Sequence, residues 1–186
     1  MLSTDTHTVL RAAWSPDGKA VYFYRFANAR QGESRLIKRE IETGRETEIL
    51  RDHLITGVAV SPDGRNIAFR SFDDPDITLM IMPSSGGDIR ELVRVKKPDI
   101  ISGPDAPSWT PDGRYLVYPM TRNDGQGKAR TELWRLDPKT KEAKPLGLTM
   151  DNVYSLALHP DLKRIAFESG IPKVEIWVME NFLPVR

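Results

Sequence analysis

Trp109-Thr110-Pro111-Asp112-Gly113-Arg114 runs directly into the apolar stretch Tyr115-Leu116-Val117-Tyr118, and this combination decides the fold. The same motif precedes a β-branched or aromatic run three more times. Its other copies are Trp14-Ser15-Pro16-Asp17-Gly18-Lys19, Val60-Ser61-Pro62-Asp63-Gly64-Arg65 and Leu158-His159-Pro160-Asp161-Leu162-Lys163. A chain that repeats one local motif at a regular interval is built from copies of one supersecondary unit.

The motif predicts a tight turn between two strands. Proline fixes φ at about −65° and suits the first corner of a type I turn, and the Asp side chain accepts hydrogen bonds from nearby backbone N–H groups. Glycine then takes a positive φ without steric cost, which permits a three-residue hairpin loop with a bulge. The fourth copy has Leu162 in place of this glycine. We expect that hairpin to be the least regular, because a non-glycine residue must adopt left-handed geometry or change the turn.

The four motif prolines follow one another at intervals of 46, 49 and 49 residues. A period of about 40 to 50 residues with short β-branched runs is typical of propeller blades, each a four-stranded sheet. Helical repeats of similar length would need apolar residues at a spacing of about 3.6. The sequence thus predicts an all-β fold of β-propeller blades, with four repeats of about four antiparallel strands each. The expected blades span residues 9–50, 55–93, 106–146 and 153–180.

The repeats leave the closure of the ring open. The last repeat ends after its third expected strand, Val174–Met179, and only the tail of a strand fits before the first repeat. We favour the interpretation that the chain is the C-terminal part of a larger propeller. The alternatives are four blades that close on residues 2–8, or a homodimer that joins two chains through open blade edges, since unpaired strand edges favour association.

Composition excludes several classes of function. The 186 residues are 39% apolar and 28% charged, as in folded globular proteins, and the net charge of +1 supplies no field that would attract nucleic acid. The chain has no cysteine, which removes disulfides, thiol chemistry and thiolate metal sites. No apolar run reaches the length of about 18 residues that a membrane span needs, and the N-terminus lacks the pattern of a signal peptide.

The motif Trp-Ser-Pro-Asp-Gly-Lys followed by an apolar strand resembles the WD-like repeat of TolB-type bacterial β-propellers. The resemblance covers nearly the whole chain, residues 1–186. It is strongest at Pro16-Asp17-Gly18, Pro62-Asp63-Gly64 and Pro111-Asp112-Gly113, whereas Pro160-Asp161 lacks the glycine. In that group the motif is structural, so the resemblance implies a fold and names no ligand. It would imply a periplasmic location if the chain belongs to a longer protein of that kind.

Candidate catalytic and metal-binding groups are few. Asp73, Asp74 and Asp76 form the densest acidic cluster, but they lack the Asp-x-Asp-x-Asp-Gly spacing of a calcium loop. The three histidines have no zinc-site spacing, and no Gly-x-Ser-x-Gly nucleophile motif is present. The four tryptophans lie in expected strands, where burial of their rings favours a packing role. We therefore expect no catalytic residue, no metal site and no cofactor.

Binding is expected at the loops of one rim, because loops on a rigid scaffold often carry function. In a propeller, the loops between the second and third strands share one face with the loops between blades. This rim is mildly basic and suited to an acidic peptide or loop of a partner protein. Its candidate residues are Arg25, Arg30, His53, Arg70, Lys96, Lys97, Arg122, Asn123, Lys128 and Arg130.

Two functions fit these features. The first is a non-catalytic propeller module for protein–protein interaction or ligand sensing. The second is the gating or substrate-binding propeller of a prolyl-oligopeptidase-like serine peptidase whose catalytic domain is not in this chain. A hydrolase or lyase site built on the propeller channel is a third alternative.

Overall fold

The computed structural model describes residues 8–28, 33–52, 54–73, 75–103, 107–123, 129–153 and 155–169. Every regular element within these residues is a β-strand, and the strands pair in antiparallel sheets that each follow the order of the chain. The predicted all-β class of propeller blades is therefore confirmed.

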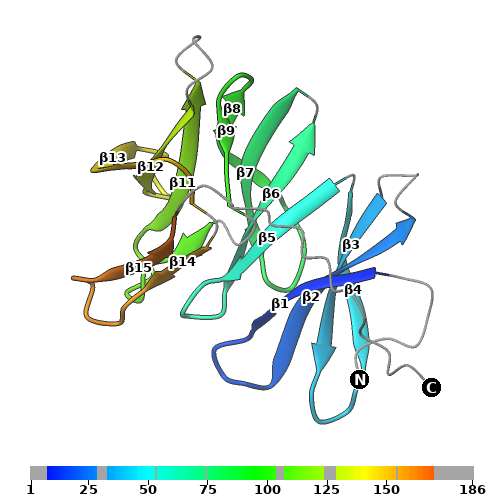
Figure 1. Cartoon of the computed structure of the whole chain (residues 1–186). Coiled ribbons are helices and arrows are strands. Elements are labelled where there is room, and N and C mark those ends of the chain that lie inside the picture. The colour runs from blue at the N-terminus through cyan, green and yellow to red at the C-terminus, as the bar shows by residue number, and fades with distance from the viewer. Residues whose placement is uncertain are drawn as a thin grey trace, which may run out of the picture.

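The strands form four sheets, which Figure 1 shows fanned around an arc. The first two sheets have four strands each. The first contains β1 (Thr8–Trp14), β2 (Ala20–Asn28), β3 (Glu33–Glu40) and β4 (Glu46–Asp52), and the second contains β5 (Leu54–Val60), β6 (Asn66–Asp73), β7 (Asp76–Pro83) and β8 (Arg90–Lys96).

The third sheet has the same four-strand path plus one short extra strand, and the fourth sheet has two strands within the described residues. The third contains β10 (Ser108–Trp109), β11 (Leu116–Asn123), β12 (Ala129–Leu136) and β13 (Ala143–Met150), with β9 (Ile100–Ile101) paired to β11. The fourth contains β14 (Ser155–Leu158) and β15 (Ile165–Glu168). The expected strand Val174–Met179 lies outside the described residues, and so does all of the possible closing segment, residues 2–8, except Thr8.

The first strand of each sheet lies on the inner side of the arc. Here β1 contacts β5, β5 contacts β10, and β10 contacts β14. The strand β9 was not predicted from the sequence, because it lies between the expected second blade, which ends at residue 93, and the third, which begins at residue 106. In the structure β8 continues to Lys96, and Ile101 then pairs with Met120 of β11.

Two apolar clusters hold the first three sheets together. One lies between the first and second sheets and includes Tyr24, Leu36 and Phe69. The other lies between the second and third sheets and includes Leu79 and Leu116. These side chains are almost completely buried. Burying each large apolar side chain contributes about 1.5 to 3 kcal/mol, so packing between blades is a principal source of stability.

The first three motif copies form the same hydrogen-bonded turn between the first and second strands of their sheets. In the first copy, the Ser15 hydroxyl donates to Asp17 Oδ1 at 2.6 Å and accepts the Ala20 N–H at 2.8 Å, while Asp17 Oδ1 also accepts the Lys19 N–H at 3.0 Å. The second and third turns repeat these contacts through the side chains of Ser61 with Asp63 and Thr110 with Asp112.

The fourth turn departs from this pattern. Leu162 has a φ of 60°, so it adopts the left-handed geometry that glycine takes in the other copies. His159 stands where the other copies have a hydroxyl residue, and its Nδ1 accepts the Asp161 N–H at 3.2 Å. The turn keeps its backbone shape at the cost of a strained non-glycine residue, as the substitution of leucine for glycine predicts.

Candidate functional site

Arg70 lies inside the molecule. Only 5% of its surface is exposed, and its Nη1 donates to the Ile101 carbonyl at 2.7 Å. Arg70 and Tyr24 occupy equivalent positions, since each follows the proline of its own motif by eight residues. Tyr24 makes the corresponding contact one blade earlier, where its hydroxyl accepts the Val58 N–H at 2.6 Å. The two side chains tie successive blades together. This placement corrects the expectation that Arg70 belongs to an exposed rim.

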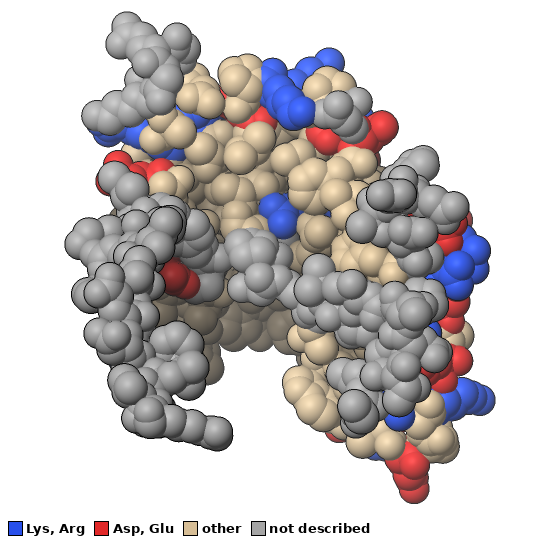
Figure 2. All heavy atoms as spheres, turned by 45° about the vertical axis from the view of Figure 1, so that its right-hand side comes forward, with Lys and Arg blue, Asp and Glu red and all other residues tan. Residues whose placement is uncertain are grey.

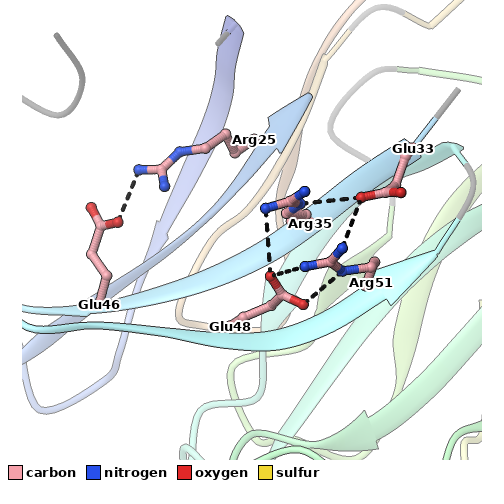
Figure 3. Close-up of polar contacts among 6 residues, drawn as sticks. All are labelled: Arg25, Glu33, Arg35, Glu46, Glu48 and Arg51. Atoms are coloured by element: carbon pink, nitrogen blue, oxygen red, sulfur yellow. Dashed lines mark hydrogen bonds and ion pairs between the residues drawn. The ribbon is translucent and has the colours of Figure 1, made fainter. Parts of the chain in front are cut away.

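Arg25 lies on the outer sheet face formed by β2, β3 and β4 (Figure 3). Its guanidinium donates to Glu46 at 2.9 Å. Arg35 and Arg51 lie beside it across the sheet, and each forms ion pairs with both Glu33 and Glu48. The distances are 3.2 Å for Arg35–Glu33, 3.9 Å for Arg35–Glu48, 3.4 Å for Arg51–Glu33 and 2.9 Å for Arg51–Glu48. Glu46 also lies 3.4 Å from Arg39, so Arg25 shares its carboxylate partner with a second arginine and belongs to an ion-pair network on this face.

Five of the predicted rim residues come together where blades two and three meet. Arg122 and Arg130 are cross-strand neighbours at the ends of β11 and β12. The segment after β8 reaches them, because Asp99 accepts the Asn123 N–H at 3.4 Å and lies 3.9 Å from Arg122. We call the set Lys96, Lys97, Arg122, Asn123 and Arg130 the basic rim.

Arg122 is the anchored member of the basic rim. Its guanidinium lies 5.1 Å from the centre of the Trp134 ring and forms ion pairs with Asp99 and Glu132. Lys96 and Arg130 are exposed, and within the described part of the chain neither forms an ion pair. The rim therefore combines one guanidinium fixed on an aromatic ring with cationic side chains that are open to solvent.

The acidic loop beside this rim is partly neutralised by its own arginine. Arg94 donates to Asp76 at 3.2 Å and lies 3.9 Å from Asp73. Asp74 lies outside the described residues. Among the side chains that are described, no group of three or more His, Asp or Glu residues is placed to hold a metal ion.

The tryptophans have different environments. Trp109 is half-buried, and its indole N–H donates to the Ala59 carbonyl of the preceding blade at 3.0 Å. Trp134 supports Arg122 as described above. Trp14 is 62% exposed, although it occupies the same position in its motif as Trp109. Trp14 therefore does not have the expected packing role. Trp177, and the rim candidates Arg30, His53 and Lys128, lie outside the described residues.

Two hollows were not predicted from the sequence. Both lie beside the motif turns, at the end of the sheets opposite the basic rim. A groove of about 710 Å³ lies between the first and second motif turns, beside Pro16, Ile41 and Gly64. A smaller pocket of about 260 Å³ lies between the third and fourth turns, beside Pro111 and Leu162. The only sequence signal for the second hollow is the leucine that replaces the motif glycine.

The surface view adds a further hollow (Figure 2). Residues other than Lys, Arg, Asp and Glu line much of its described surface, a basic patch lies within it, and further acidic and basic side chains gather around its margin.

No protein family model matches the sequence. TolB from Acinetobacter baumannii has a similar structure, with a TM-score of 0.70 and 21% identity; the match covers 89% of this chain and 39% of that one. An oligogalacturonate lyase in complex with manganese has a TM-score of 0.71 and 17% identity over 91% of this chain and 49% of the other. A curated relative, the uncharacterized peptidase YuxL of Bacillus subtilis, is 37% identical over 67 residues, which are 36% of this chain and 9% of the relative.

The chain therefore has the fold of a TolB-like β-propeller. It spans half or less of the length of these three similar proteins. The portion of the chain that the structure describes contains no helix long and apolar enough to cross a membrane.

Proposed function

We propose that the chain is a non-catalytic β-propeller module that binds an acidic peptide or loop of a partner protein at the basic rim. The observation that carries this proposal is that the turn from Lys96 to Asp99 meets the strand ends that carry Arg122 and Arg130. The packed blades hold these positions fixed, so a partner meets a preformed surface.

The chemistry of the rim favours weak, electrostatically steered binding. Exposed ion pairs contribute about 0 to 1 kcal/mol each, so a few contacts with Lys96 and Arg130 give modest affinity. Complementary charge mainly raises the association rate and makes binding sensitive to salt. Arg122 adds geometric selectivity, because the Trp134 ring and two carboxylates restrict its guanidinium.

The test is the affinity of a fluorescent peptide of about twelve alternating Glu and Ser residues, measured by anisotropy at low and at physiological salt. The double variant Lys96→Glu/Arg130→Glu is expected to bind about tenfold more weakly, which corresponds to about 1.4 kcal/mol. The matched control Lys139→Glu/Lys163→Glu makes the same change of charge at the opposite end of the sheets and is expected to bind as the wild type does. Equal weakening by both variants would show attraction to net charge alone, and would contradict binding at the rim.

The second candidate is a gating or substrate-binding propeller of a serine peptidase. The similarity to the YuxL peptidase over 67 residues favours it. A fluorophosphonate probe that labels serine hydrolases, applied to the full-length protein that contains this chain, distinguishes the two. Labelling of a serine there supports the peptidase assignment, whereas no labelling together with rim binding supports the interaction module.

A further inference from the structure

The contact between successive motif turns changes at the fourth blade. In the second and third turns, a glycine faces the proline of the preceding turn: a Cβ placed on Gly64 would lie 3.6 Å from Pro16 Cδ, and one on Gly113 would lie 3.7 Å from Pro62 Cδ. The fourth turn has Leu162 at this position, and its side chain is 55% exposed. Leu162 and Pro111 both line the pocket of about 260 Å³ that separates these turns.

The pocket wall is mainly apolar. Val117 of β11, Leu146 of β13 and Ile165 of β15 line it together with Leu162. Leu146 is also 37% exposed, so this apolar surface is open to a ligand. The volume lies below the range of about 300 to 1,000 Å³ that is usual for small-molecule pockets, which suits one amino-acid side chain better than a larger ligand.

One cationic group in the wall is available to a ligand. The Arg135 guanidinium stacks on Tyr115 at 4.3 Å from the ring centre, and no carboxylate within the described residues forms an ion pair with it. The other charged groups of the wall have partners. Arg164 donates to Asp161 at 2.8 Å, and Asp112 accepts the Thr110 hydroxyl and the Arg114 N–H.

We propose that this pocket binds the carboxy-terminal residue of a partner peptide, with a bulky apolar side chain against Leu162 and the α-carboxylate on Arg135. The pocket has room for about one residue, and Arg135 is part of its wall, so a residue that carries both an apolar side chain and a carboxylate matches it. The inference rests on the proposed function as an interaction module, and it adds a second site at the end opposite the basic rim.

The test is calorimetric titration of the full chain with a short Gly-Ser peptide that ends in phenylalanine with a free carboxylate. The same peptide with an amidated end, and one that ends in serine, are expected to bind at least tenfold more weakly. Arg135→Gln is expected to lose binding to a similar extent, Arg135→Lys to retain part of it, and Lys139→Gln to leave it unchanged. Thermal unfolding checks that each variant is folded.

Equal binding of the free and amidated peptides, or unchanged binding to Arg135→Gln, would overturn the assignment. If N-acetylphenylalanine binds as tightly as the peptide, the proposal that the ligand is a peptide is wrong, and the pocket is a site for small apolar carboxylates. The acidic rim peptide is titrated into the same samples. If it binds and the phenylalanine peptide does not, the pocket assignment fails while the proposed function stands; if neither binds, both fail.

Discussion

Gly64 packs against Pro16 across two successive blades, at a distance that leaves room for a Cβ but for little more. Gly113 and Pro62 repeat this relationship one blade later. The motif therefore closes its own hairpin, and in its first two copies the proline also provides the surface on which the next turn rests.

The glycines are required for their backbone geometry more than for space. Gly18, Gly64 and Gly113 have φ values of 70°, 71° and 70°. Nothing lies within 4 Å of a Cβ on Gly18, whereas Gly64 faces Pro16. Gly18→Ala and Gly64→Ala are therefore both expected to destabilise the fold by about 1 kcal/mol, because both place alanine in left-handed geometry. Urea unfolding measures this, and a much larger loss for Gly64→Ala would show that the contact with Pro16 dominates.

The bond between Tyr24 and Val58 stabilises the junction of the first two blades. Tyr24→Phe removes the acceptor of the Val58 N–H from a nearly dry environment, and we expect a loss of about 1 to 3 kcal/mol in the free energy of unfolding. Tyr22→Phe is the matched control, since Tyr22 is also buried at this junction but makes no comparable bond among the described residues. Equal effects of the two variants would mean that the Tyr24 hydroxyl bond is unimportant.

Trp109 and Trp14 hold the same motif position in different surroundings. Trp109→Phe is expected to cost about 1 to 2 kcal/mol, because the Ala59 carbonyl loses its donor and apolar contact is lost. Trp14→Phe is expected to change stability by less than about 0.5 kcal/mol, since most of that ring is exposed. Denaturant unfolding followed by circular dichroism compares them; a larger cost for Trp14 would show that its ring is covered in solution.

The turn carboxylates should make the fold sensitive to acid. Hydroxyl and backbone N–H hydrogen bonds hold the pKa of the motif aspartates below the ordinary value of 3.8, at Asp17, Asp63 and Asp112. A carboxyl whose pKa is lower in the folded state stabilises the fold above its unfolded pKa, and this contribution is lost as the pH falls through the folded pKa. We therefore expect the urea midpoint to decrease below about pH 4, and to decrease less in Asp63→Asn. Parallel pH profiles for wild type and variant would contradict this origin.

The parts of the fold that depend on local chemistry were predictable from the sequence. Pro-Asp-Gly located the first three turns, and Leu162 identified the irregular one before its φ was known. The two-residue strand β9 was not predictable, because Ile100–Ile101 is too short to show an alternating pattern and forms only by pairing with β11. The second and third sheets end a few residues after the expected blades, at Lys96 and Met150, because pairing with the neighbouring strand continues there.

The candidate site was predictable only in part. Charge placed Lys96, Arg122 and Arg130 at the rim, but charge alone did not reveal that Arg70 points into the junction with the next blade. That difference depends on which sheet face a residue occupies and on what the neighbouring blade presents. The pocket beside Leu162 forms where the third and fourth motif turns, which are distant in sequence, approach each other. No local sequence pattern therefore predicts it.

Binding of a partner protein at the basic rim can be located residue by residue. In a nuclear magnetic resonance titration of the isotope-labelled chain with the acidic peptide, the backbone amide shifts show where the peptide makes contact. We expect the shifts to gather at residues 96–99, 122–123 and 129–131. Shifts that gather at the motif turns, around residues 16–19, 62–65 and 111–114, would contradict it.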